Sequence, residues 1–282
     1  MTLIRRMKEM SQANDSTGFS SQNASARQAR NWKQQLLALA GVVLTLASTP
    51  GLAAPAIRNI VLVHGAFADG SSWAPVISRL QRLGYHVTAV QNPLTSLADD
   101  VAATEKVLQR QTGDVLLVGH SWAGAVITQA GNAANVKGLV YLSALVPDND
   151  ESVSDLLTRL KAPMEGLAAD ANGMLWLDQP ARFRQVMAAD VPLRQARLLA
   201  AVQQPIASAS FGGKVGHAAW HDKPSWYVHT TQDQALPPAV QLRMAGQIGA
   251  TVWSVPASHL SMISRPATIA SLLDRAAQAA SR

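Results

Sequence analysis

Hydrophobic and polar positions alternate in long blocks from residue 58 onward. Near-continuous apolar runs predict buried strands over residues 58–63, 85–91, 114–119, 137–145, 225–231 and 250–255. Apolar residues at helical spacing predict helices over residues 72–83, 97–111, 122–132, 237–248 and 266–279. Strands that alternate with helices in this way form βαβ units around a parallel sheet. The predicted fold class is α/β, a six-stranded, mainly parallel sheet flanked by helices.

This alternation stops between residues 147 and 223. An interval of about 75 residues is too long for an ordinary connection, so we expect an inserted cap over residues 148–223. The core is then expected in two parts, residues 57–147 and 224–282. Apolar clusters without strand periodicity predict three or four short helices in the cap. Trp176 lies in one of these clusters, where it is a candidate for the core of the cap and for substrate contact.

Residues 1–56 form a leader that does not share the pattern of the core. Residues 36–47 are an apolar run, with basic residues before it and small residues after it. That pattern is typical of a secretory signal peptide, and the run is too short for an ordinary membrane span. We therefore expect cleavage near Ala53 or Ala56 and an exported protein, periplasmic or secreted, whose mature form has no membrane association. A retained N-terminal anchor helix is the alternative, and a true start downstream of Met1 would explain the long polar segment before the apolar run.

The charge of the chain lies mostly in this leader. Residues 1–56 hold six Lys or Arg against two Asp or Glu, which accounts for +4 of the net charge of +6. The remaining chain has no cluster of basic residues with interleaved aromatics, so we expect no nucleic-acid partner. The absence of cysteine excludes disulfides and thiolate metal sites. His217 and His221 have metal-site spacing, but the glycines at 212, 213 and 216 predict a loop there, and we expect no metal and no cofactor.

The sequence Gly119-His120-Ser121-Trp122-Ala123-Gly124 follows a predicted strand and opens a predicted helix. In that context a G-x-S-x-G pattern marks a nucleophile elbow, in which small residues let the strand and helix approach each other. The residue two after Ser121 is alanine here, and Gly124 comes one place later. Ser121 is therefore the predicted nucleophile.

A serine nucleophile needs a base and an acid that orients the base. Asp233 follows the predicted strand 225–231, and His259 follows the predicted strand 250–255. The carboxyl ends of parallel strands lie at the edge of the sheet where an open α/β fold places its active site, so these side chains are expected to lie together. Their order along the chain, Ser, Asp and His, also suits a catalytic triad. Asp148, directly after the fourth predicted strand, is the competing candidate for the acid.

The oxyanion hole of such a site requires two backbone N–H groups. One comes from the residue after the nucleophile, here Trp122, and the other from the turn after the first strand, where the sequence reads Val63-His64-Gly65-Ala66-Phe67. We expect the amides of Ala66 and Trp122 to serve. Phe67 is the competing donor and also a candidate substrate contact.

These motifs, together with Asp233-Gln234-Ala235-Leu236-Pro237-Pro238 and Ser258-His259, resemble the α/β-hydrolase superfamily. The similarity covers residues 58 to about 278 and is greatest to bacterial esterases related to plant methylesterases and hydroxynitrile lyases. It implies an α/β-hydrolase fold with an inserted helical cap, and the catalytic roles given above for Ser121, Asp233 and His259. The lyase branch usually has Thr where this chain has Gly65 and Lys where it has Leu260, so the resemblance favours hydrolysis.

The sequence thus predicts an exported serine hydrolase, a carboxylesterase acting on a small-molecule partner, a small or medium uncharged ester. The alternatives on the same triad are a hydroxynitrile-lyase-like activity and a perhydrolase or haloperoxidase-like activity. A ligand-binding protein with little turnover is the alternative outside enzymes.

Overall fold

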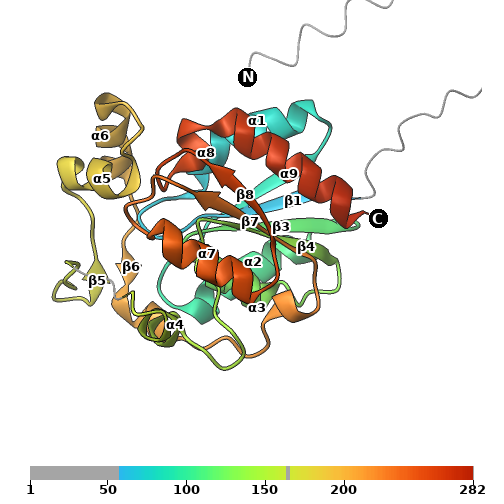
Figure 1. The fold of residues 1–282 in the computed structure, drawn as a ribbon, viewed down its shortest axis with the longest axis horizontal. Helices are drawn as coiled ribbons and strands as arrows, with labels where there is room; N and C mark the ends of the chain where they lie inside the picture. The colour runs from blue at the N-terminus through green and yellow to red at the C-terminus, as the bar shows by residue number, and fades with distance from the viewer. Residues whose placement is uncertain (1–56, 163–165, 282) are drawn as a thin grey trace, which may run out of the picture. The chain divides into compact units, whose positions relative to one another are not determined.

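The computed structural model describes residues 57–162 and 166–281. Six parallel strands form one sheet (Figure 1), and their order is β2-β1-β3-β4-β7-β8. Their bounds are β1 (Asn59–Val63), β2 (His86–Val90), β3 (Val115–His120), β4 (Val136–Leu142), β7 (Ser225–Thr230) and β8 (Thr251–Val255). The predicted fold class is confirmed, and each of the six predicted runs overlaps one of these strands, although β3 ends one residue after its run and β4 begins one residue before its run. β4 ends three residues before the predicted run because the backbone turns at Ser143, which has a φ of 46°.

Helices cover both faces of this sheet. Helices α1 (Ala74–Arg82) and α9 (Pro266–Ala280) lie together on one face, and α2 (Leu97–Gln109) and α3 (Ala123–Ala130) on the other (Figure 1). Every residue of β1 and β3 is buried as a result. This two-sided burial explains why the central strands are apolar without alternation.

Local sequence signals set where the helices begin. A proline occupies the first turn of α1, of α9 and of α7 (Pro238–Gln247), where its missing N–H costs no hydrogen bond. The Ser96 side chain caps α2 by accepting a hydrogen bond from the Asp99 amide. A short helix, α8 (Ser261–Ser264), precedes α9, and a 3-10 turn, η1 (Gly70–Trp73), precedes α1.

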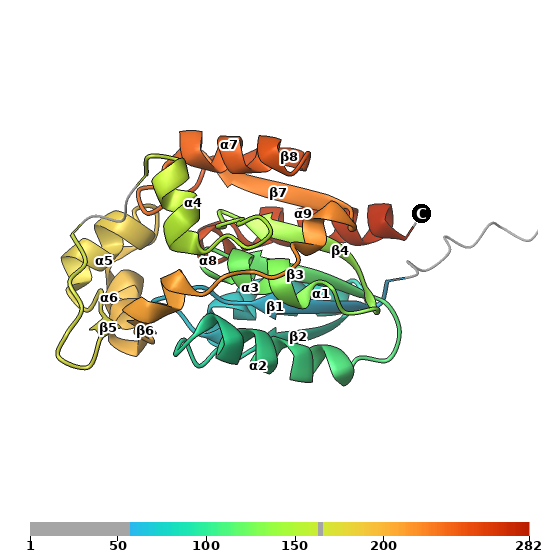
Figure 2. The ribbon, with the colours of Figure 1, turned by 90° about the horizontal axis from the view of Figure 1, so that it is seen from below.

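The interval between β4 and β7 holds the expected short helices. They are α4 (Val153–Arg159), α5 (Pro180–Met187) and α6 (Leu193–Val202), with 3-10 turns η2 (Ser208–Gly212) and η3 (Ala219–His221). A two-stranded antiparallel pair, β5 (Met174–Leu175) with β6 (Ile206–Ala207), was not predicted, because strands of two residues leave no period in the sequence. Figure 2 shows α5, α6, β5 and β6 beyond the carboxyl ends of the main strands.

The predicted signal peptide, with its apolar run at residues 36–47 and cleavage near Ala53 or Ala56, lies outside the described residues and stays a prediction. Within residues 57–162 and 166–281, no helix combines the length and the apolar character that a membrane crossing requires.

Candidate active site

Ser121 occupies a strained turn between β3 and α3. Its φ is 56°, in the left-handed region that a non-glycine residue adopts at a cost. A Cβ added to Gly119 would lie 2.6 Å from the Ala123 carbonyl oxygen, and one added to Gly65 would lie 2.8 Å from the Ser121 Cβ. The small residues of both motifs are therefore required by contacts around the serine.

The shifted glycine of the elbow has its own structural reason. A Cβ on Gly124 would run into the carbonyl oxygen of Leu145, because the start of α3 presses against the segment that follows β4. Ala123 is fully buried beside it. The backbone contact that requires a glycine therefore falls at residue 124, one place later than in the usual G-x-S-x-G pattern. At residue 123, where that pattern has its second glycine, this chain accommodates an alanine.

Asp233 and His259 meet at the carboxyl edge of the sheet. The His259 Nδ1 lies 2.7 Å from the Asp233 Oδ2, and the two residues are 1% and 2% exposed, respectively. Because the carboxylate accepts, Nδ1 carries the hydrogen, which leaves Nε2 able to take a proton from a nucleophile. The half-exposed side chain of Asp148 is instead bound to another histidine, with its carboxylate 2.8 Å from the His221 Nε2. The structure thus brings together the favoured acid and not its rival.

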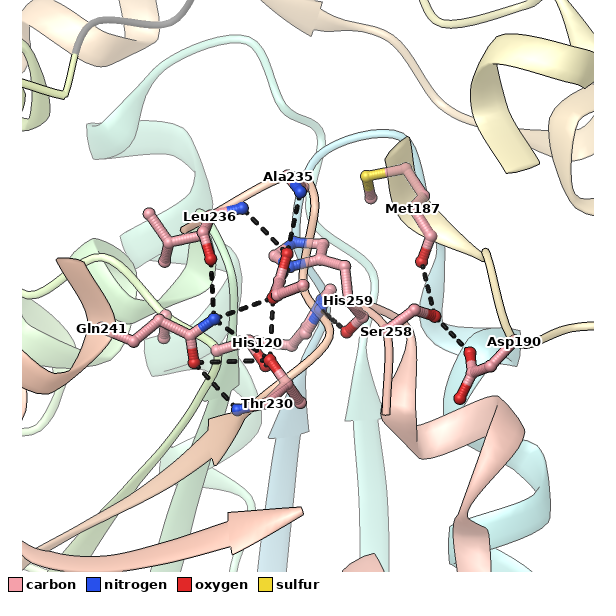
Figure 3. A network of polar contacts seen from close by, with 12 residues as sticks. His120, Met187, Asp190, Thr230, Ala235, Leu236, Gln241, Ser258 and His259 are labelled. Atoms are coloured by element: carbon pink, nitrogen blue, oxygen red, sulfur yellow. Dashed lines mark hydrogen bonds and ion pairs between the residues drawn. The ribbon is translucent and has the colours of Figure 1, made fainter. Parts of the chain in front are cut away.

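Four further donors surround the Asp233 carboxylate, and Figure 3 labels the residues that supply them. They are the amides of Ala235 and Leu236 on Oδ1, at 2.8 and 2.9 Å, and the Thr230 hydroxyl and Gln241 amide on Oδ2, at 2.8 and 2.9 Å. Burial raises the pKa of Asp233, but attraction to His259 and these hydrogen bonds outweigh it, so the pKa lies below its ordinary value. The acid is held ionised and in one orientation.

Gln241, which motif reasoning did not find, completes this arrangement from α7. Its side chain is fully buried. Its Nε2 also donates to the Leu236 carbonyl at 2.8 Å, and its Oε1 accepts from the Thr230 amide at 3.0 Å. A lone glutamine on a helix carries no motif, so the sequence held no signal for this role.

The residues on either side of His259 are bound to the cap. The Leu260 amide donates to the Met187 carbonyl at the end of α5 at 3.0 Å. The Ser258 hydroxyl donates to the Asp190 carboxylate just beyond that helix (Figure 3). The position of the predicted base therefore depends on where the cap sits.

His120, the residue before the predicted nucleophile, holds the same loop from the core. Its Nε2 lies 3.1 Å from the His259 carbonyl oxygen, which can only accept, so Nε2 carries the hydrogen. Burial, and then the neighbouring His259 ring, hold the pKa of His120 well below its ordinary value. His120 is thus a neutral donor that ties the elbow to the base.

The two expected oxyanion donors lie at the site. In the part of the chain that the structure describes, no turn, loop or cap hydrogen bond uses the amide of Ala66 or that of Trp122. The Phe67 amide, the competing donor, is engaged by the Gln204 carbonyl of the cap at 3.1 Å. This contact favours Ala66 over Phe67 as the predicted donor from the turn after β1.

A cavity of about 330 Å³ connects these groups. Ser121, His259, Ala66, Trp122 and Phe67 line it, and its remaining wall is mostly apolar: Leu145, Leu157, Ala162, Leu167, Leu177, Val186, Met187, Phe211, Ala235, Leu236 and Pro237, with Arg182 and Gln234 as the polar members. The structure thus places Phe67 in the cavity. It does not bring Trp176 there: that side chain is 42% exposed, and its indole N–H donates to Asp170.

His217 and His221 each face a separate carboxylate. The His217 Nε2 lies 2.6 Å from Asp222, and His221 is bound to Asp148 as described. Within the described ranges, no three His, Asp or Glu side chains gather as a metal site would require.

Comparison with known proteins agrees with this geometry. A model described as "Alpha/beta hydrolase family" matches residues 60–272. Alpha/beta hydrolase nvfD of Aspergillus novofumigatus is 30% identical over 210 residues, 67% of this chain and 83% of that protein. A pyrethroid hydrolase of Sphingobium wenxiniae is 26% identical over 247 residues, 76% of this chain and 85% of that protein. Methylesterases of Arabidopsis thaliana are among the further relatives, as the motifs predict.

Solved structures show the same fold. The crystal structure of a pyrethroid hydrolase from Sphingobium faniae superimposes with a TM-score of 0.67 at 23% identity, covering 79% of this chain and 98% of that one.

Proposed function

The chain belongs to the alpha/beta hydrolase family, and within that family we propose that it is a serine carboxylesterase for small or medium uncharged esters. One observation carries the proposal. Ser121, His259, Ala66 and Trp122 all line a single, mostly apolar cavity, and the His259 Nδ1 is hydrogen-bonded to Asp233. Relatives whose names describe ester-cleaving enzymes, among them a carbendazim hydrolyzing esterase and methylesterases, support the reaction type.

The reaction follows from these positions. The Ser121 hydroxyl gives its proton to the His259 Nε2 and attacks the ester carbonyl carbon, while the Ala66 and Trp122 amides bind the oxyanion that forms. His259 then protonates the departing alcohol, leaving an acyl-serine. Water, activated by the same histidine, attacks this intermediate and releases the acid. Asp233 stays ionised throughout and stabilises the imidazolium.

Two positions favour hydrolysis over the lyase alternative. A Cβ at Gly65 would lie 2.8 Å from both the Ser121 Cβ and the His120 carbonyl oxygen, so the threonine of the lyase branch does not fit this turn. Leu260 stands where that branch carries lysine, and its side chain is 1% exposed.

The apolar leader supports a second proposal, that the enzyme is exported and acts outside the cytoplasm.

A p-nitrophenyl ester series from acetate to decanoate tests the function, with Ser121→Ala as its matched variant. We expect turnover of the short and medium esters and a loss in kcat on the order of a million-fold in the variant. Stoichiometric labelling of the unmodified protein by a fluorophosphonate, absent in the variant, identifies the nucleophile. A protein that binds esters without turnover or labelling would instead be a binding protein, and more than a few per cent of activity in Ser121→Ala would exclude the elbow serine.

A further inference from the structure

Asp100, at the start of α2, is a fully buried carboxylate without a cation. Its Oδ2 accepts from the Trp122 indole Nε1 at 2.7 Å, and its Oδ1 accepts from the Leu94 amide at 2.8 Å. Across residues 57–162 and 166–281, no Lys, Arg or His forms an ion pair with it. Burying a carboxylate on two neutral donors is costly, and burial raises the pKa of Asp100 to about 6. A buried carboxylate that lowers stability in this way is more often retained for a functional role than for folding.

Trp122 is the residue whose position matters for the proposed reaction. It directly follows the predicted nucleophile, its amide is an expected oxyanion donor, and the residue lines the cavity. The Trp122 ring meets Phe211 of the cap edge-to-face, with centroids 5.1 Å apart, and Phe211 also lines the cavity. The Trp122 indole N–H finds its partner in Asp100 and in no other described residue.

The second contact of Asp100 leads to the cap. Leu94 has a φ of 58°, a conformation that the bond from its amide to Asp100 supports. Its carbonyl accepts from the Ala207 amide in β6 of the cap at 2.9 Å. Asp100 thus bonds both Trp122, which lines the cavity, and Leu94, which contacts the cap.

We infer that Asp100 is a positioning residue for the oxyanion hole: by binding the Trp122 indole it fixes the residue that presents the second oxyanion amide. The inference rests on the proposed esterase function. A donor displaced by about 1 Å stabilises the transition state far less while affecting ground-state binding little. Loss of the contact should therefore appear in kcat more than in KM.

Asp100→Asn tests this with little change in shape. The new NH₂ group faces an N–H donor in either orientation, so one of the two hydrogen bonds is lost. We expect kcat to fall by about tenfold to a hundredfold, with KM changed by less than about threefold. Asp99→Asn is the matched control, because it removes a carboxylate from the same turn of α2 at an exposed position; its kcat should stay within about twofold of the unmodified protein.

A double-mutant cycle with Trp122→Phe separates positioning from general stability. Phenylalanine keeps the backbone amide and removes the indole N–H, so this variant alone should lose kcat to a similar extent. In the Trp122→Phe background, Asp100→Asn should then have less than about a twofold further effect. Full additivity would overturn the inference, as would an unchanged kcat in Asp100→Asn. If Asp100→Asn does not fold, an unchanged kcat in Trp122→Phe overturns it equally.

The proposed function is tested separately by turnover in the unmodified protein and its loss in Ser121→Ala. With both established, a normal Asp100→Asn enzyme contradicts the positioning role alone. Absence of ester turnover in the unmodified protein would overturn the function and the inference with it.

Discussion

Replacing Gln241, which supports the proposed triad acid Asp233, by methionine should lower the free energy of unfolding strongly and kcat only slightly. Methionine has a similar length but no hydrogen-bonding group that can replace the amide. The change removes the bond to Asp233 and leaves the Thr230 amide and the Leu236 carbonyl without their side-chain partner. All three groups lie in the buried part of the site around α7.

The structure sets the size of each effect. Two buried backbone groups without partners cost about 1–3 kcal/mol each, so the free energy of unfolding should fall by roughly 2–6 kcal/mol. For a chain of this size, that loss corresponds to a decrease in Tm of roughly 4–24 °C. Asp233 still keeps four of its five hydrogen-bond donors, His259 among them. We therefore expect kcat to fall by only about tenfold.

Thermal unfolding and kcat for a p-nitrophenyl ester, measured well below the new Tm, give both quantities. Gln247→Met is the matched control, because Gln247 lies on the same helix and bonds Arg159 at the surface rather than the acid. It should change Tm by less than about 2 °C. A Gln241→Met protein as stable as its parent would refute the role given to the buried amide. A loss of kcat by several orders of magnitude in the folded variant would show that the remaining donors do not hold Asp233.

Three further outcomes are expected. Asp233→Asn should lower kcat about ten-thousand-fold through the wrong imidazole tautomer, whereas Asp148→Asn should change it by less than about tenfold; the reverse ranking in folded variants would move the acid to β4. Because the folded-state pKa of Asp233 lies below the ordinary 3.8, its stabilisation is complete above that pH and is lost as the pH falls through the folded value. Urea unfolding between pH 6 and pH 2 should show this loss in the unmodified protein and a smaller one in Asp233→Asn, and equal losses would contradict it. N-terminal sequencing of protein from the native host should find a start just after Ala53 or Ala56, and a start upstream of residue 36 would favour an anchor.

The strands of the sheet could be predicted because each one is marked by its own short stretch of sequence. A strand buried on both faces must be apolar throughout, and β1 and β3 are buried at every position, so their sequences identify them without reference to the rest of the chain. The serine turn is equally local. The glycines at 65 and 119 are required by contacts around Ser121, and Gly124 by its contact with the Leu145 carbonyl; these requirements leave a pattern in the sequence.

The polar supports of the site could not be predicted in the same way. Asp100 contacts Trp122 across 22 residues of chain, and His120 contacts His259 across 139. Neither pair has a characteristic spacing, since the fold alone brings the partners together. The same reason applies to Trp176, because whether a cap side chain faces the cavity depends on the packing of α4, α5 and the β5–β6 pair.

The acid and the base of the proposed triad are held by different parts of the molecule, and this difference has a consequence for the cap. The acid is held entirely from the core, by the turn after β7 and by α7. The base is held by the core through His120 and by the cap through Met187 and Asp190. Movement of α5 would therefore displace His259 while leaving Asp233 in place. Substitutions in the cap can alter proton transfer as well as substrate fit, so a change in kcat from a cap variant is not by itself a sign of substrate contact.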